Sequence, residues 1–233
     1  MLVLLEQKRA ALISCAVTRG LNPKAPTKPS GLDWLGEIPK HWKLERSKRY
    51  FIERDERSVT GDEEMLTVSH ITGVTPRSEK DVNMFEADSN EGYKLVSPDQ
   101  LVINTLWAWM GAMGVARHEG IVSPAYHVYR IAEGLLPAYV DLLVRILAFK
   151  AEVIRFSKRV WSSRLRLYPE GLHQIWIPVP PIAEQEAIIA HIRAHQTRAA
   201  ALESALRDSI ALLKERRSAL ITAAVTGRLD NSV

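Results

Sequence analysis

One stretch of the sequence concentrates basic side chains and contains no acidic one. Residues 155–166 read RFSKRVWSSRLR, which places five bases around the adjacent Ser162 and Ser163. Arginine and lysine at this density favour binding to phosphate oxygens, and the serine hydroxyls can reach a nucleic-acid backbone or base edge. For any single arginine, a solvated surface charge is an equally good interpretation. The candidate nucleic-acid contacts in this stretch are Lys158, Arg159, Ser162, Ser163, Arg164 and Arg166.

A second stretch and two isolated residues are weaker candidates. Residues 40–57 hold seven bases against four acids. Arg77 and Asn104 are added because their turn-rich surroundings predict that they are exposed. Trp107 and Trp109 are expected in the core, since recognition of duplex nucleic acid needs no exposed aromatic ring.

Metal binding and nucleophilic catalysis have little support in the sequence. His191 and His195 lie four residues apart in HIRAH, a spacing that can bind zinc, but the glutamate of HExxH and a third ligand in register are missing. A solvated position or a place on a helix seam is the favoured interpretation. Cys15 is the single cysteine, which excludes an internal disulfide and fits a reducing cytoplasm. We predict no metal site.

Nucleotide and cofactor motifs are also missing. The sequence has no G-x-x-x-x-G-K-[ST] loop, and Gly111-x-x-Gly114 is better explained by turn geometry. The only Pro-Pro pair, in Val179-Pro180-Pro181-Ile182, lacks the preceding amide or acid of an adenine methyltransferase motif. We predict no catalytic residue and no cofactor.

Residue types divide the chain into helical ends and a mixed middle. All sixteen aromatic residues lie between Trp34 and Trp176, and residues 1–19 and 182–226 contain neither glycine nor proline. Such flanks are typical of helix. The middle alternates turns with short apolar runs, so the predicted fold class is α+β: one mixed domain between a short N-terminal helix and a long C-terminal coiled-coil-forming helix.

Within the middle, periodicity predicts individual elements. Strands are expected at 65–70, 101–105, 125–131 and 174–179, and a helix at 137–156 with a stripe through Val140, Leu143, Leu147, Ala151 and Ile154. Residues 22–32, NPKAPTKPSGL, are expected to form a proline-rich linker.

The C-terminal segment carries an almost regular seam in steps of three and four residues. Pro180 and Pro181 precede it and Gly227 is a natural C-terminal stop. A helix this long cannot bury its stripe on a compact neighbour, so it predicts a helical partner. The seam residues expected to mediate this contact are Ile188, Ile192, Leu202, Leu206, Ile210, Leu213 and Leu220.

The two helical ends are related in sequence. LLEQKRAALISCAVTRGL (4–21) aligns without gaps to LLKERRSALITAAVTGRL (212–229), with ten of eighteen positions identical. Two amphipathic helices can converge on similar composition, but the shared order ALI-[ST]-x-A-V-T argues against convergence.

Several ordered motifs give the chain a family resemblance. GLDWLGEIPKHWKLERSKRYF (31–51), VINTLWAWMGAMGVA (102–116), GIVSPAYHVYRI (120–131) and SSRLRLYPEGLHQIWIPVPPIAEQEAII (162–189) resemble successive parts of a target-recognition domain. Such domains belong to the DNA-specificity subunits of type I restriction–modification systems. The repeated LL-x-[EK]-[KR]-R-x-ALI-x-x-AVT resembles the tail of the spacer helices of that family.

The resemblance implies an organisation and a set of partners. It implies a spacer-helix tail at 1–21, a linker at 22–33, a target-recognition domain at 34–181 and a spacer helix at 182–229. The implied partners are double-stranded DNA, methyltransferase (modification) subunits and a restriction/translocase subunit. A full subunit has two domains and two spacer helices, so this chain matches the C-terminal half, and we expect it to form a homodimer that reads an interrupted palindrome.

Composition is compatible with these expectations. The 233 residues carry 31 basic and 27 acidic side chains, and this excess of +4 permits an anionic partner without requiring one. The sequence contains no run of 18 apolar residues, so we predict no membrane span and expect a cytoplasmic location. The alternative function is a coiled-coil assembly or scaffold protein whose aromatic domain binds another protein. Salt-dependent DNA binding would separate the two.

Overall fold

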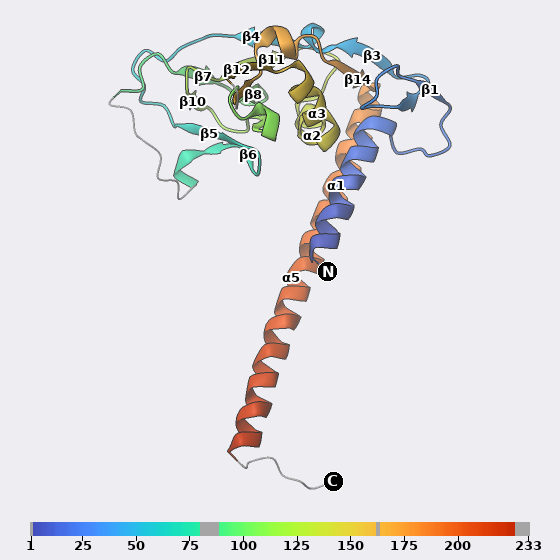
Figure 1. Ribbon diagram of the computed structural model, residues 1–233, viewed down its shortest axis with the longest axis vertical. Helices are drawn as coiled ribbons and strands as arrows, with labels where there is room; N and C mark the ends of the chain where they lie inside the picture. The colour runs from blue at the N-terminus through green and yellow to red at the C-terminus, as the bar shows by residue number, and fades with distance from the viewer. Residues whose placement is uncertain (1, 80–88, 162–163, 227–233) are drawn as a thin grey trace. The chain divides into compact units, whose positions relative to one another are not determined.

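The computed structural model describes residues 2–79, 89–161 and 164–226. The chain forms two compact units, one made of residues 10–190 and the other of residues 1–9 with 191–233. Two helices have residues in both units: α1 (Leu2–Arg19) and α5 (Ile182–Val225). The mixed α/β architecture, with a short first helix and a long last one, confirms the predicted fold class (Figure 1).

The larger unit contains short strands and short helices. The strands are β1 (Thr27–Pro29), β2 (Glu37–Pro39), β3 (Lys43–Arg46), β4 (Phe51–Arg54), β5 (Leu66–Ser69), β6 (Gly73–Pro76), β7 (Lys94–Val96), β8 (Leu101–Ile103), β9 (Met113–Val115), β10 (Gly120–Val122), β11 (His127–Ile131), β12 (Lys158–Trp161), β13 (Arg164–Arg166) and β14 (Trp176–Val179). The helices are α2 (Pro137–Arg145), α3 (Leu147–Phe156) and α4 (Pro169–Leu172), with single 3-10 turns η1 (Ser47–Arg49), η2 (Arg77–Glu79) and η3 (Ala108–Met110). The strands predicted at 65–70, 101–105, 125–131 and 174–179 are confirmed as β5, β8, β11 and β14, with shorter bounds.

A four-stranded antiparallel sheet in the order β4-β11-β8-β9 forms the centre of this unit. Every residue of β8 and β9 is buried, so these strands have apolar neighbours on both faces. Helix α2 lies against β9, where a Cβ on Gly114 would come within 3.0 Å of Asp141 Oδ1. That oxygen accepts a hydrogen bond from the Val115 amide at 2.9 Å, so glycine at 114 permits the close approach.

Two-stranded ladders surround the sheet. They pair β1 with β2, β3 with β14, β5 with β6, β7 with β10 and β12 with β13, all antiparallel. Apolar side chains of β5, β6, β7, β8, β10 and β11 form one core cluster. β1 falls within the segment that the sequence analysis assigns to the linker.

Within the larger unit, polar contacts attach the first turns of α5 and the last turns of α1 to the rest of the fold. The Gln185 side chain, fully buried, accepts from the Leu136 amide and donates to the carbonyls of Gly134 and Pro180. Trp42 Nε1 donates to Glu184 at 2.9 Å. The Tyr139 hydroxyl, fully buried, donates to the Val17 carbonyl at 2.9 Å.

The single helix predicted over 137–156 is wrong. Ile146 is extended (φ −71°, ψ 151°) and divides the segment into α2 and α3. Leu147 and Ile154, expected on the buried stripe, are 76% and 45% exposed, whereas Phe149 and Val153 are fully buried. Buried residues at 143, 144, 146 and 149 occupy too wide an arc for one face of a straight helix, and the extended residue turns the second helix so that a different face packs.

The long C-terminal helix is confirmed, since α5 runs unbroken for 44 residues, roughly 65 Å at about 1.5 Å per residue. Its seam residues differ in exposure along the helix. Ile188 and Ile192 are each 1% exposed and Leu206 is half-buried, whereas Leu202, Ile210, Leu213 and Leu220 are between 45% and 64% exposed. Among the described helices, none combines the length and apolar character that crossing a membrane requires.

Candidate nucleic-acid interface

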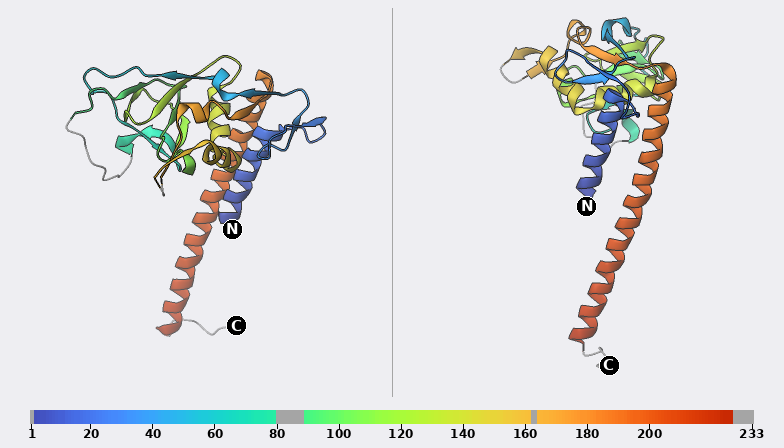
Figure 2. Two further views of the ribbon diagram at one scale, coloured as in Figure 1. Left: turned by 45° about the horizontal axis from the view of Figure 1, so that its top comes forward. Right: turned by 90° about the vertical axis from the view of Figure 1, so that its right-hand side faces the viewer.

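The basic run of the sequence folds mainly into the β12–β13 hairpin. Lys158 and Arg166 are direct partners in its register, and Arg159 lies opposite Leu165. The hairpin projects from the edge of the larger unit, at the left of the right-hand view in Figure 2. Like charges placed directly opposite each other destabilise a ladder, so an anion between these strands would relieve an existing repulsion.

The bases of this run differ in their exposure and in the side chains that they contact. Arg155 belongs to α3 and forms an ion pair with Glu152 at 3.4 Å. Lys158 is exposed, and the Arg166 guanidinium, half-buried, stacks on the Tyr168 ring at 5.8 Å. Within the described part of the chain, Arg155 is the only base of this run with a carboxylate inside 4.0 Å. For Arg159 and Arg164 the backbone alone is described, and Ser162 and Ser163 lie outside the described residues.

A loop carrying two tryptophans lies beside the hairpin. β13 and α3 both contact η3, and the Leu167 amide donates to the Thr105 carbonyl at 3.2 Å. Trp107 is 51% exposed and stacks on Trp109 with ring centroids 6.2 Å apart. The expectation that Trp107 lies in the core is therefore wrong, because Trp107 lies in a turn and its ring stacks at the surface on the half-buried Trp109.

Sequence reasoning missed Lys150, which extends the basic surface toward this loop. Gly111 has φ +94°, and a Cβ there would lie 2.2 Å from Lys150 Cε, so the lysine stem packs across the glycine. Burial, together with the nearby Arg145 charge, lowers the pKa of Lys150 below its ordinary value. The apolar periodicity of the sequence does not predict where Lys150 lies, because the orientation of α3 depends on the break between α2 and α3.

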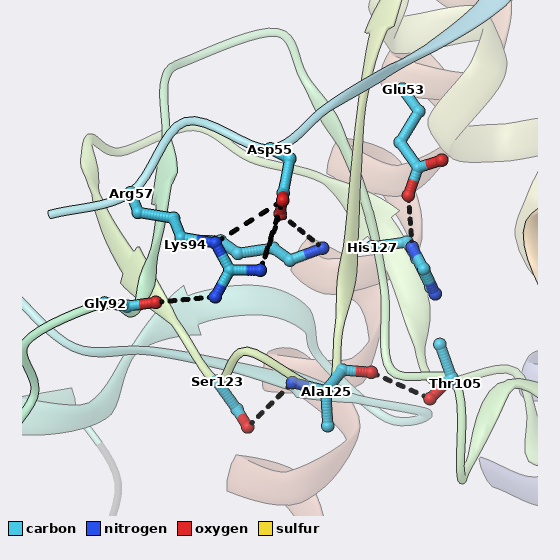
Figure 3. Close-up of polar contacts among 9 residues, drawn as sticks. All are labelled: Glu53, Asp55, Arg57, Gly92, Lys94, Thr105, Ser123, Ala125 and His127. Carbon is cyan, nitrogen blue, oxygen red and sulfur yellow. Dashed lines mark hydrogen bonds and ion pairs between the residues drawn. The ribbon is translucent and has the colours of Figure 1, made fainter.

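Asn104 is not exposed, contrary to the expectation from its turn-rich context. It is 5% exposed, and its Nδ2 donates to the Tyr126 hydroxyl at 2.8 Å. Its Oδ1 is buried without a hydrogen-bond partner among the described residues. Beside it, Thr105 Oγ1 donates to the Ala125 carbonyl at 2.8 Å (Figure 3). Asn104 and Thr105 thus join the loops after β8 and before β11, and a direct base contact by Asn104 would require this pairing to open.

Arg77 begins the short turn η2 and is half-buried. Its amide donates to the Met65 carbonyl at 2.7 Å, which connects it to the β5–β6 ladder. Arg77 directly follows the β5–β6 ladder, whereas the other basic candidates lie on the β12–β13 hairpin. Within the described chain, η2 makes no extensive contact with β12 or β13. The structure therefore does not bring Arg77 together with the other basic candidates.

Three of the seven bases in the second basic run form ion pairs with its own acids. Arg49 pairs with Glu45 at 3.3 Å, Arg54 with Glu56 at 3.5 Å and Arg57 with Asp55 at 3.1 Å. Because these three charges are partly compensated, we rank residues 40–57 below the hairpin as a candidate phosphate-binding region. The sequence count of seven bases against four acids did not show which of them pair.

Asp55 is the centre of the most connected charge cluster (Figure 3). It accepts from Lys94 Nζ at 3.0 Å and from the Arg57 guanidinium, which also donates to the Gly92 carbonyl at 3.2 Å. The Lys94 side chain is only 5% exposed, so Asp55 compensates a buried ammonium group. The hydrogen bond from Lys94 is the main reason why the pKa of Asp55 lies below its ordinary 3.8.

Asp55→Asn should therefore destabilise the larger unit by roughly 1–2 kcal/mol at neutral pH, a value reduced because Asp55 itself is 57% exposed. A lowered folded-state pKa contributes stability above the unfolded-state pKa, and this contribution is lost as the pH falls through the folded value. Urea unfolding of both proteins between pH 7 and about pH 2 should show the difference shrinking below pH 4. A difference that stays constant over this range would contradict this assignment.

Neither catalysis nor metal binding gains support from the geometry. Glu53 Oε1 and His127 Nδ1 are 2.5 Å apart on neighbouring strands, and the contact joins β4 to β11 (Figure 3). The rings of His191 and His195 are adjacent, with centroids 4.6 Å apart. Residues 2–79, 89–161 and 164–226 contain no group of three His, Cys, Asp or Glu side chains arranged to hold a metal ion.

Comparisons with known proteins identify the architecture. Neither a family model nor a curated protein matches the sequence. Among solved structures, the chain is similar to a chain from a study of complex assembly and conformational transition in the type I restriction–modification system. The two share 18% identity with a TM-score of 0.65, over 98% of this chain and 53% of that one.

A second similar structure is the HsdS subunit from Thermoanaerobacter tengcongensis, with 17% identity and a TM-score of 0.55 over 98% of this chain and 52% of that one. This chain spans about half the length of both proteins. It has the fold of type I specificity subunits over that half, as the sequence resemblance implies.

Proposed function

We propose that the chain is a non-catalytic DNA-recognition module of a type I restriction–modification complex. The observation that carries the proposal is the match of 98% of the chain to half of such specificity subunits. Supporting it, the β12–β13 hairpin presents the like-charged pair Lys158 and Arg166, and β13 contacts the turn that follows the exposed Trp107. Phosphate contacts from this face would fix the register of the module on duplex DNA.

The proposal includes the organisation of the complex. The target-recognition domain is residues 34–181, the spacer helix is residues 182–229, and the cytoplasm is the expected location. The helix would hold methyltransferase and restriction/translocase subunits on the target. Because one domain reads one half-site, we further propose a homodimer through the spacer helix with its recognition domains related by a two-fold axis. Its target would be an interrupted palindrome whose gap is set by the helix.

Titration of the purified chain with duplex DNA at several salt concentrations tests the proposal. We expect affinity to fall linearly with the logarithm of salt concentration, with a slope that reports the number of phosphates neutralised. The chain alone should neither transfer methyl groups nor hydrolyse ATP. Binding that is absent at low salt, together with capture of protein partners, would favour the scaffold alternative. Methylome sequencing of a host carrying the chain with and without its methyltransferase then identifies the sequence read.

A further inference from the structure

The two copies of the repeated segment have opposite environments. In α1, Ala16 and Val17 are 3% and 0% exposed, whereas Val225, the counterpart of Val17, is 82% exposed. Their local helical structure is the same, since Thr18 Oγ1 and Thr226 Oγ1 each donate to the carbonyl four residues earlier at 2.7 Å. The same helical sequence is therefore packed against the fold in one copy and exposed to solvent in the other.

The α1 seat lies within the unit of residues 10–190. The Tyr139 hydroxyl donates to the carbonyl of Val17, one of the last-turn carbonyls that a helix cannot satisfy internally. After the helix, Gly20 has φ +76° and packs against Trp42, whose Cζ2 atom would lie 3.2 Å from a Cβ at this position. We call the surface formed by Tyr139 and Trp42, on which the end of α1 packs, the α1 seat.

The positions of α1 that are buried in this seat have identical residues in the second copy. Among the α1 residues whose exposure is described, Ala16, Val17 and Thr18 are buried, and they are identical to Ala224, Val225 and Thr226. The half-buried Leu12 and Ile13 are identical to Leu220 and Ile221. Substitutions concentrate at exposed positions, such as Cys15, which becomes Ala223. Side chains that fit the seat are thus present on the tail of α5.

We propose that the α5 tail, residues 212–226, of a second copy of the chain docks in the α1 seat, and that α1 is its internal competitor. The inference rests on the proposed homodimer and adds that dimer formation requires α1 to leave its seat. The proposed docking includes only the helical residues of the repeat, because the position of Gly20 in the first copy is occupied by Arg228 in the second. Effective concentration favours the covalently attached α1 over a free tail, so α1 weakens self-association.

Matched aspartate substitutions test the competition. Val225→Asp removes a tail side chain that would be buried in the seat and should weaken dimerisation at least ~10-fold. Val17→Asp disfavours only the competitor, so it should tighten dimerisation. Val59→Asp is the control, because Val59 is 86% exposed and lies outside both helices. Sedimentation velocity over a concentration series measures all three, and a dimer affinity that Val17→Asp lowers or leaves unchanged would overturn the competition.

A cross-linking experiment covers the case in which Val17→Asp does not fold. Benzoylphenylalanine at position 222, whose counterpart Ser14 is half-buried in α1, should cross-link to peptides of the other chain around Trp42 and Tyr139 in a mixture of isotopically light and heavy chains. Cross-links between chains that reach only other α5 residues would contradict docking in the seat. DNA binding of the same protein is measured in parallel, so loss of the seat contact with DNA binding intact refutes this inference alone.

Discussion

Replacing Arg159, Arg164 and Arg166 together with alanine should weaken binding of duplex DNA by roughly 100-fold or more. The three residues lie on the two strands of the β12–β13 hairpin, where the paired Lys158 and Arg166 leave positive charge without local compensation. Each lost phosphate contact should also reduce the salt slope by about one, hence by up to about three for the triple variant. Fluorescence anisotropy at several salt concentrations measures both quantities.

A charge-matched control separates contact from net charge. Arg49, Arg54 and Arg207 each form an ion pair, with Glu45, Glu56 and Glu203 respectively. Alanine at these three positions removes the same formal charge and should leave the salt slope nearly unchanged. If the hairpin variant keeps both affinity and slope, the recognition face lies elsewhere, and residues 40–57 become the next region to test.

Replacing Leu202 and Leu206 with aspartate should convert the proposed homodimer into monomers that bind half-sites weakly. Leu202 is 49% exposed and Leu206 half-buried, on a helix whose seam continues to Leu220. Two charges at the centre of the seam would have to be desolvated against apolar residues of the partner helix, which is strongly unfavourable. Sedimentation equilibrium and titration with half-site and full-site duplexes check the result.

Ala200→Asp with Ser204→Asp provides the matched control, because these exposed residues lie on the opposite face of α5. This control should dimerise like the wild type. A wild-type chain that sediments as a monomer at tens of micromolar would refute the dimer. Methylation of an asymmetric site with no second specificity chain present would do the same.

Local patterns of the sequence were sufficient for the helical ends and several strands. Residues 182–226 contain no glycine or proline, and α5 is continuous there because nothing in that stretch interrupts the backbone hydrogen-bond pattern. Short apolar runs such as LVI at 101–103 become strands because β-branched and aliphatic residues pack well on a pleated surface. The repeat between residues 4–21 and 212–229 is likewise visible without coordinates.

Tertiary packing decided what periodicity could not. The seven residues of 143–149 are mostly apolar, so their spacing does not show that Ile146 becomes extended or that Phe149 is buried in place of Leu147. Packing of α2 against β9 and of α3 against η3 accompanies this arrangement. The same applies to Asn104, whose burial depends on Tyr126 from a loop 22 residues away. Long-range partners are not encoded in local spacing, so exposure at such positions could not be predicted.

The candidate site divides in the same way. Sequence alone located the basic run at 155–166, because charge density is a property of composition. Only the structure showed that Arg155 pairs with Glu152 and that three bases of residues 40–57 pair with acids of the same run. It also showed that Lys150 packs on the tryptophan loop that contacts β13. Whether a charge is available to a ligand depends on distances to other side chains, and the folded backbone sets those distances.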